Sequence, residues 1–193
     1  MPLIIRFAPA LAMALMLLPS SASAQWLGIG AAWSAPGSTG VVDEANMTHV
    51  LFDQAKASVR PSAPVGTLVW LRYPVVLSAS WMYWSPIAPH NVLGYYTHAK
   101  LTLSFQRNDE SALILASLRR VSLTTGETTL MMSVDGLASP PSADLQTVTA
   151  NLTCGDEGCI RPDIYAYWVE VALWKVKAAS DPKVVAVGVH LTP

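Results

Sequence analysis

Glu170 is the acidic side chain whose setting most invites a chemical role, because it interrupts the apolar segment Tyr165–Lys177. If Glu170 is buried, its carboxylate needs a cationic partner, and Arg72 or Arg119 could supply one. If it is exposed, it marks the outward face of a strand. A glycosidase would need a second carboxylate facing the same cleft, and the sequence offers none to pair with Glu170. We therefore keep Glu170 as a candidate ligand-binding residue and expect no catalytic role for it.

Other catalytic or metal-binding patterns are missing from the sequence. No Gly-x-Ser-x-Gly elbow and no phosphate-binding glycine loop is present, and the acidic turns do not follow an EF-hand pattern. The histidines lack paired metal-ligand spacing; they are His49, His90, His98 and His190. We expect no catalytic residue, no metal and no cofactor, and therefore predict that the protein is not an enzyme. An exported hydrolase with a site assembled from distant residues is the least favoured alternative.

Tryptophans flank Glu170 at even spacing, so that Trp168, Glu170 and Trp174 share one face of a strand. The opposite face is apolar and suits a core. If it is the core, the two tryptophans point outward about 20 Å apart. Exposed aromatic rings at such a separation could stack on sugar rings or anchor a protein partner. The alternative is that both faces are buried between sheets.

A second aromatic cluster, Trp81-Met82-Tyr83-Trp84, places large side chains on both faces of a short strand. One face must fill the core, and the other needs a covering sheet or a ligand. The candidate ligand-binding residues are Trp81, Trp84, Trp168, Glu170 and Trp174.

The two cysteines, Cys154 and Cys159, enclose four residues, of which two are glycines. In an oxidising compartment such a pair closes a small disulfide loop, which stabilises the fold by about 2 kcal/mol. A redox motif would normally use two intervening residues, and a zinc site would need two further ligands nearby. We predict a structural disulfide.

Residues Met1–Ala24 have the organisation of a cleaved signal peptide, with one positive charge, an apolar stretch and a final Ala22-Ser23-Ala24. The apolar stretch, Phe7–Leu18, is too short for a bilayer span, which needs roughly 20 residues. A membrane anchor is the alternative interpretation. We expect an exported, periplasmic or extracellular protein with no transmembrane segment in its mature chain.

The composition agrees with one folded domain over Gln25–Pro193. Charged residues make up 13% of the chain and hydrophobic residues 52%, with a net charge of −1. These values argue against a disordered chain and against a nucleic-acid-binding surface.

Strand patterns dominate the mature sequence. Leu93–Gln106 alternates strictly between apolar and polar residues, and the apolar segment Ser111–Leu123 follows a short polar turn. With Thr128–Val134 these segments predict a three-stranded meander, and Tyr165–Lys177 with Val184–Leu191 predicts a closing hairpin. Pro74 should mark an edge strand, a bulge or a strand end.

These segments together predict an all-β fold, an antiparallel β-sandwich of about seven to nine strands, for which a jelly-roll arrangement is one form. At most one short helix is expected. It would fall within residues 43–56, where the pattern fits a helix or a strand.

Two function classes follow. The first is a non-catalytic binding or recognition module that uses exposed aromatic residues to hold a glycan or a protein. The second is a structural or assembly subunit of a cell-surface or appendage complex, because nothing after Val184–Leu191 except two residues protects the edge of that apolar strand. Ala63–Trp70 also resembles the beginning of a strand in fimbrial subunits of chaperone–usher pili, although the cysteine spacing departs from the fimbrial one.

Overall fold

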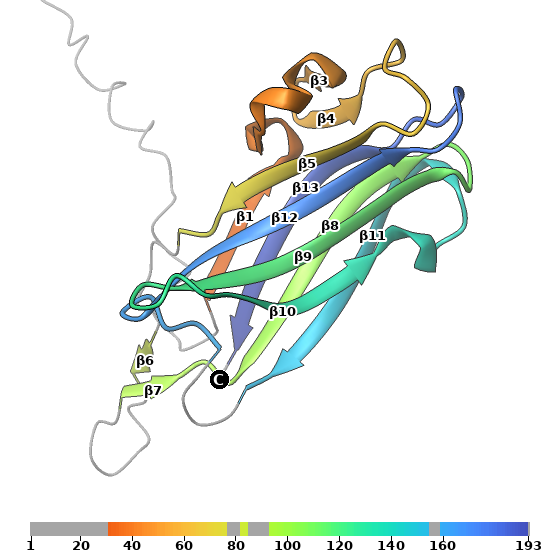
Figure 1. Cartoon of the computed structure of the whole chain (residues 1–193). Coiled ribbons are helices and arrows are strands. Elements are labelled where there is room, and N and C mark those ends of the chain that lie inside the picture. Colours follow the sequence, from red (N-terminus) through yellow and green to blue (C-terminus); the bar gives the residue numbers. More distant parts are fainter. Residues whose placement is uncertain (1–30, 77–81, 85–92, 155–158, 193) are drawn as a thin grey trace, which may run out of the picture.

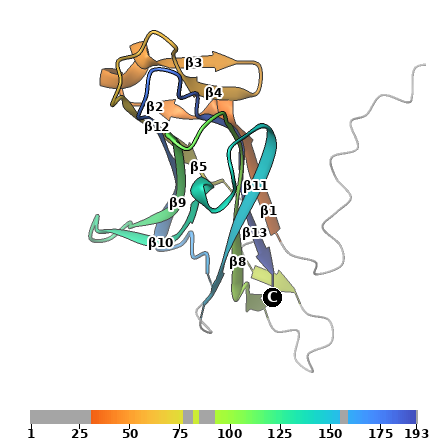
Figure 2. The same cartoon turned by 90° about the vertical axis from the view of Figure 1, so that its right-hand side faces the viewer.

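The computed structural model describes residues 31–76, 82–84, 93–154 and 159–192. The proposed signal peptide and Trp81 lie outside the described residues, and of Trp84 only the backbone is described. Within these ranges the chain is an antiparallel β-sandwich, as predicted, with two sheets packed face to face (Figures 1 and 2).

Sheet 1 has the strand order β11-β8-β13-β4-β3, and β1 pairs with β13 beside β4. Its strands are β1 (Ala31–Pro36), β3 (Val50–Asp53), β4 (Lys56–Val59), β8 (His98–Arg107), β11 (Ser142–Thr153) and β13 (Lys183–Thr192). Sheet 2 has the order β10-β9-β12-β5-β2. Its strands are β2 (Val41–Val42), β5 (Leu68–Pro74), β9 (Ala112–Ser122), β10 (Thr128–Asp135) and β12 (Tyr165–Lys175).

A small ladder of β6 (Met82–Trp84) and β7 (Leu93–Tyr95) stands apart from the two sheets. The described strands thus number thirteen, more than expected, because several are only two to four residues long. Three short 3₁₀ helices complete the described elements: η1 (Gly37–Thr39), η2 (Glu44–His49) and η3 (Gly136–Ala138). The ambiguous region 43–56 therefore contains both kinds of structure, since η2 leads directly into β3. None of the described helices is long and apolar enough to cross a membrane.

The core lies between the inner faces of the two sheets. Alternate residues of β8 and β12 are fully buried there, as the period of two requires. The largest buried side chains include Tyr73, whose hydroxyl donates a hydrogen bond of 2.8 Å to the carbonyl oxygen of Gly37. Pro74 ends β5, as expected for a residue without an amide hydrogen.

Two predicted hairpins are wrong. β8 and β9 belong to different sheets, and so do β12 and β13, so each connection crosses the sandwich instead of turning back within a sheet. The polar residues of the two crossings bind each other. Asn108 donates from Nδ2 to the carbonyl oxygen of Ala179 at 2.6 Å, and Asp181 donates its amide hydrogen to Oδ1 of Asn108 at 2.7 Å. This arrangement lets the apolar faces of consecutive strands face each other across the core.

The prediction that the last strand has an open edge is also wrong. β13 lies inside sheet 1, with β8 on one side and β1 and β4 on the other. The pairing that was predicted between β9 and β10 is confirmed.

The disulfide between Cys154 and Cys159 is present, with the Cα atoms 5.2 Å apart. Backbone hydrogen bonds flank it. The amide of Cys154 donates to Thr97 at 2.7 Å, and that of Cys159 donates to Tyr96 at 2.8 Å. The crosslink therefore fixes the end of β11 against the residues that precede β8.

Candidate ligand-binding face

The outward side of sheet 2 carries the aromatic residues that the sequence singled out. In β12, Val169, Val171 and Leu173 are fully buried and point into the core. The alternating residues Trp168 and Trp174 therefore point outward, as predicted if the opposite face is core. Trp168 is half-buried, and 42% of the surface of Trp174 is exposed.

Strand β5 adds a third tryptophan to this side. Trp70 lies directly opposite Ala172 of β12, so its side chain shares the outward face with Trp168 and Trp174. We call this surface the tryptophan face. It consists of the outward residues Leu68, Trp70, Arg72, Leu113, Leu115, Ser117, Arg119, Trp168, Glu170, Ala172 and Trp174.

The register orders the face into rows that run across β5, β12 and β9. Trp174 lies between Leu68 and Leu113, and the next row places Ala172 beside Trp70. Both of these rows are apolar. In the third row Glu170 lies between Arg72 and Ser117, and in the fourth row Trp168 lies beside Arg119. An apolar half of the face therefore adjoins a charged half.

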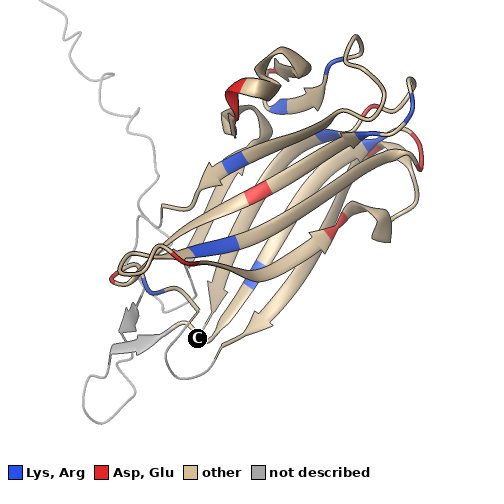
Figure 3. Ribbon diagram, in the orientation of Figure 1, with Lys and Arg blue, Asp and Glu red and all other residues tan. Residues whose placement is uncertain are grey.

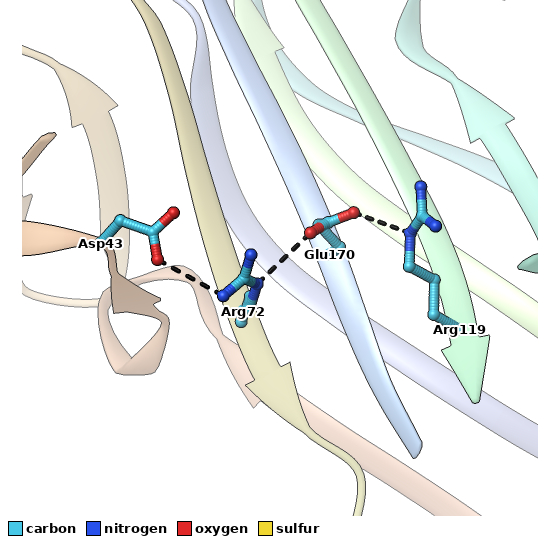
Figure 4. A network of polar contacts seen from close by, with 4 residues as sticks. All are labelled: Asp43, Arg72, Arg119 and Glu170. Atoms are coloured by element: carbon cyan, nitrogen blue, oxygen red, sulfur yellow. Dashed lines mark hydrogen bonds and ion pairs between the residues drawn. The ribbon is translucent and has the colours of Figure 1, made fainter. Parts of the chain in front are cut away.

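The charged half is built around Glu170, which is 9% exposed (Figure 4). Its two carboxylate oxygens contact different arginines: Oε1 lies 3.3 Å from Nε of Arg72, and Oε2 lies 2.7 Å from Nε of Arg119. Arg72 in turn lies 3.3 Å from Asp43, which precedes η2. The sequence named both arginines as possible partners, and the structure uses both.

This network matters for binding because it holds two guanidinium groups in place at a partly exposed surface. The side chains of Arg72 and Arg119 are 52% and 32% exposed. Each guanidinium has five N–H donors, and the contacts with Glu170 and Asp43 use only some of them. Two arginines and two carboxylates also cancel in charge. The arrangement therefore suits an uncharged ligand with several oxygen atoms.

The apolar half surrounds a depression with a volume of about 270 Å³. It is lined by Leu68, Trp70, Leu113, Ile114, Leu115, Asp135, Leu137, Ala172 and Trp174. Asp135 is the one charged residue of this lining, and its Oδ1 accepts a hydrogen bond from the amide of Leu137 at 2.8 Å. The depression can accept an apolar ring or side chain beside Trp70 and Trp174.

The structure thus joins three of the five predicted residues, Trp168, Glu170 and Trp174, and adds Trp70. The sequence contained a signal for Trp70, because Val69 and Leu71 alternate with it in the same way as the core residues of β12. Alternation within β5 alone does not show which strand lies beside it, and only the pairing of β5 with β12 places Trp70 next to Trp174.

Charged residues are sparse along the strands and concentrate at loops and strand ends (Figure 3). In the part of the chain that the structure describes, no three His, Cys, Asp or Glu side chains come together in a way that could hold a metal ion.

No protein-family model matches the chain, and no curated protein matches its sequence. Solved structures with a similar fold include a xylan-binding module, CBM15, at 10% identity and a TM-score of 0.47, covering 84% of this chain and 97% of that one. A CBM4 structure has 11% identity and a TM-score of 0.40, with 84% and 94% covered. The Gx strain of infectious bursal disease virus gives 9% identity and 0.37, with 84% and 32% covered. Similarities this distant concern the β-sandwich architecture, and what this chain binds has to be argued from its own residues.

Proposed function

We propose that this protein is a non-catalytic binding module that holds an uncharged glycan on the tryptophan face. The observation that supports it best is the presence of three tryptophans from adjacent strands on one outward face, next to a fixed arginine–glutamate network. Aromatic rings stack on the apolar faces of sugar rings, while guanidinium and carboxylate groups bind hydroxyl groups. The face offers both kinds of contact side by side.

The spacing of the tryptophans favours an extended ligand. Trp168 and Trp174 are six residues apart on β12, which corresponds to about 20 Å. Trp70 lies on the neighbouring strand opposite Ala172, so it is a diagonal neighbour of Trp174, about 7–8 Å away between backbones. A chain of sugars lying along β12 would meet Trp174 and Trp70 first, then the charged row, and finally Trp168.

Glu170 has an orienting role in this proposal. Both of its carboxylate oxygens are engaged by arginines, and the side chain is almost fully buried. It positions Arg72 and Arg119, which present donors to the ligand. The module performs no chemistry on the glycan in this scheme.

The proposal includes export. A leader over Met1–Ala24 would be removed, and Gln25–Pro193 would form a single domain in the periplasm or outside the cell. The disulfide between Cys154 and Cys159 supports an oxidising compartment, where such bonds persist.

The direct test is a titration of the mature chain with a panel of neutral oligosaccharides, followed by intrinsic tryptophan fluorescence and calorimetry. We expect at least one oligosaccharide to bind, and we expect Trp174→Ala to weaken its binding about tenfold, as for the truncation of a large aromatic side chain that contacts the ligand. Phe52→Ala is the matched control, because Phe52 is an aromatic residue of similar exposure, 45%, on β3 of sheet 1. The proposal fails if no member of the panel binds, or if both variants lose the same affinity.

A structural or assembly role is the second candidate. Its original support, an open edge on the last strand, has been removed by the position of β13 inside sheet 1. The apolar half of the tryptophan face remains a surface on which another chain could pack. Sedimentation velocity over a wide concentration range distinguishes the two: a monomer at all concentrations argues against assembly through this face.

A further inference from the structure

The outward side of sheet 1, on the opposite side of the sandwich, carries a second group of polar side chains. His98 and Lys100 of β8 are exposed and alternate with the buried residues Ala99 and Leu101. His190 of β13 is exposed in the same way. These residues therefore share one outward face, which we call the histidine–lysine face.

The register brings these side chains together across three strands. His190 lies opposite Lys100, and Lys100 lies opposite Asn151 of β11. In the next row His98 lies between Thr192 and Thr153. Directly opposed side chains in an antiparallel sheet have their Cβ atoms about 5 Å apart. Lys100 is thus flanked by His190 on one neighbouring strand and by Asn151 on the other.

These residues line a depression with a volume of about 420 Å³. Its lining is His98, Ala99, Lys100, Thr102, Asn151, Leu152, His190 and Thr192. The polar members can all donate hydrogen bonds, through ammonium, imidazole, amide or hydroxyl groups. Nδ1 of His98 lies 3.0 Å from the hydroxyl oxygen of Thr97, a contact that orients the imidazole ring.

The lining contains no carboxylate. Among the described residues of the strands of sheet 1, the acidic side chains are Asp53 on β3 and Asp144 on β11. Asp144 precedes Asn151 by seven residues on the same strand, which corresponds to about 23 Å. Lys100 lies directly opposite His190, so an anion bound between them would contact both side chains.

We propose that the histidine–lysine face is an anion-binding site that takes a tetrahedral oxyanion, a sulfate or phosphate group. Lys100 forms the ion pair with the anion, and His98, His190 and Asn151 donate hydrogen bonds to its remaining oxygens. Charge-assisted hydrogen bonds of this kind are roughly twice as strong as neutral ones. The site lies on the other sheet from the tryptophan face and does not depend on the glycan proposal. A free ion and a sulfated or phosphorylated sugar present the same group.

The test is a titration of the mature chain at constant ionic strength with inorganic sulfate, inorganic phosphate and a sugar 6-sulfate, with chloride as the reference ion. Histidine ring signals in NMR spectra report binding at this face directly. We expect saturable shifts of the His98 and His190 signals with the oxyanions and none with chloride. Tighter binding of the sugar sulfate than of inorganic sulfate would identify an esterified sugar as the ligand of this face. Equal binding of the two would identify the free ion as the ligand. Both outcomes support the site.

Substitutions distinguish a specific anion-binding site from nonspecific attraction of anions to positively charged residues. We expect Lys100→Met and His190→Asn each to weaken sulfate binding by about tenfold or more. Lys177→Met is the matched control, because Lys177 is an exposed lysine just after β12 and outside this face. Circular dichroism checks that each variant is folded. Shifts that never saturate, or an equal loss of affinity in the Lys177 control, overturn the proposal.

Discussion

Oε2 of Glu170 lies 2.7 Å from Nε of Arg119 on the neighbouring strand, which makes this the shortest contact in the network on the tryptophan face. Because Oε1 of the same carboxylate contacts Arg72, one acidic residue joins β5, β12 and β9. The same network can therefore stabilise the sheet and orient the two arginines for a ligand. Its two roles can be separated by measuring stability and binding in the same variants.

Replacing Glu170 by alanine should lower the free energy of unfolding. Breaking a buried ion pair by removing one partner costs 3–5 kcal/mol, but Arg72 and Arg119 are partly exposed and can be hydrated, so we expect about 1–3 kcal/mol. Glu170→Gln keeps one hydrogen-bond acceptor and should lose less. Urea unfolding at pH 7 measures both, with Glu110→Gln in the exposed turn before β9 as the control. An alanine variant as stable as the control would show that the network contributes nothing to folding.

Much of this face could be predicted from the sequence. Alternation in β12 identified the core side, and a single carboxylate among apolar residues required a cationic partner. Arg72 and Arg119 were predicted as possible partners, and both contact Glu170. These inferences succeeded because they depend on one strand and on the energetic cost of an unpaired charge.

The sheet membership of consecutive strands could not be predicted. The four polar residues between β8 and β9 fit a hairpin turn as well as a crossing between sheets, and the outcome depends on contacts such as that of Asn108 with Ala179, 71 positions away. The place of Trp70 in the site was missed for a related reason. Its face is known only once the register that puts it opposite Ala172 is known.

Lys175 should contribute more to the stability of the fold than an exposed lysine does. It is 1% exposed, and its Nζ donates to the carbonyl oxygens of Pro61 at 2.5 Å and Ala63 at 3.1 Å. Lys175→Met would fill similar space but leave these carbonyls without their donor, at a cost of about 1–3 kcal/mol. Urea unfolding measures the loss, and hydrogen exchange should show faster opening of residues 60–66. Lys177→Met, at an exposed position, should change neither quantity.

Reducing the disulfide should destabilise the fold moderately. The loop between Cys154 and Cys159 is short, so the expected loss is about 2 kcal/mol. The amide hydrogen bonds to Tyr96 and Thr97 should weaken along with it. Thermal unfolding with and without a reducing agent measures the effect. The double serine variant is the control, because it should match the reduced protein and no longer respond to the reductant.

Tyr73 should make the stability of the protein depend on pH in the alkaline range. Burial raises the pKa of its phenol above the ordinary value, and its hydroxyl donates to Gly37 at 2.8 Å. In the unfolded chain a tyrosine ionises near pH 10, whereas the folded protein keeps the proton, so the stability is fully present below about pH 10 and falls as the pH rises.

Tyr73→Phe isolates this effect. At pH 7 the variant should be less stable than the wild type by about 1 kcal/mol, because the buried carbonyl of Gly37 loses its donor. By pH 11 the wild type should have lost about 1.4 kcal/mol through ionisation of the unfolded tyrosine, which the variant cannot lose. The advantage of the wild type should therefore disappear by pH 11 and leave the variant more stable by about 0.4 kcal/mol, as measured by urea unfolding at both pH values. A difference that stays constant would mean that Tyr73 ionises equally easily in the folded protein, and that its hydroxyl is not held by Gly37 in solution.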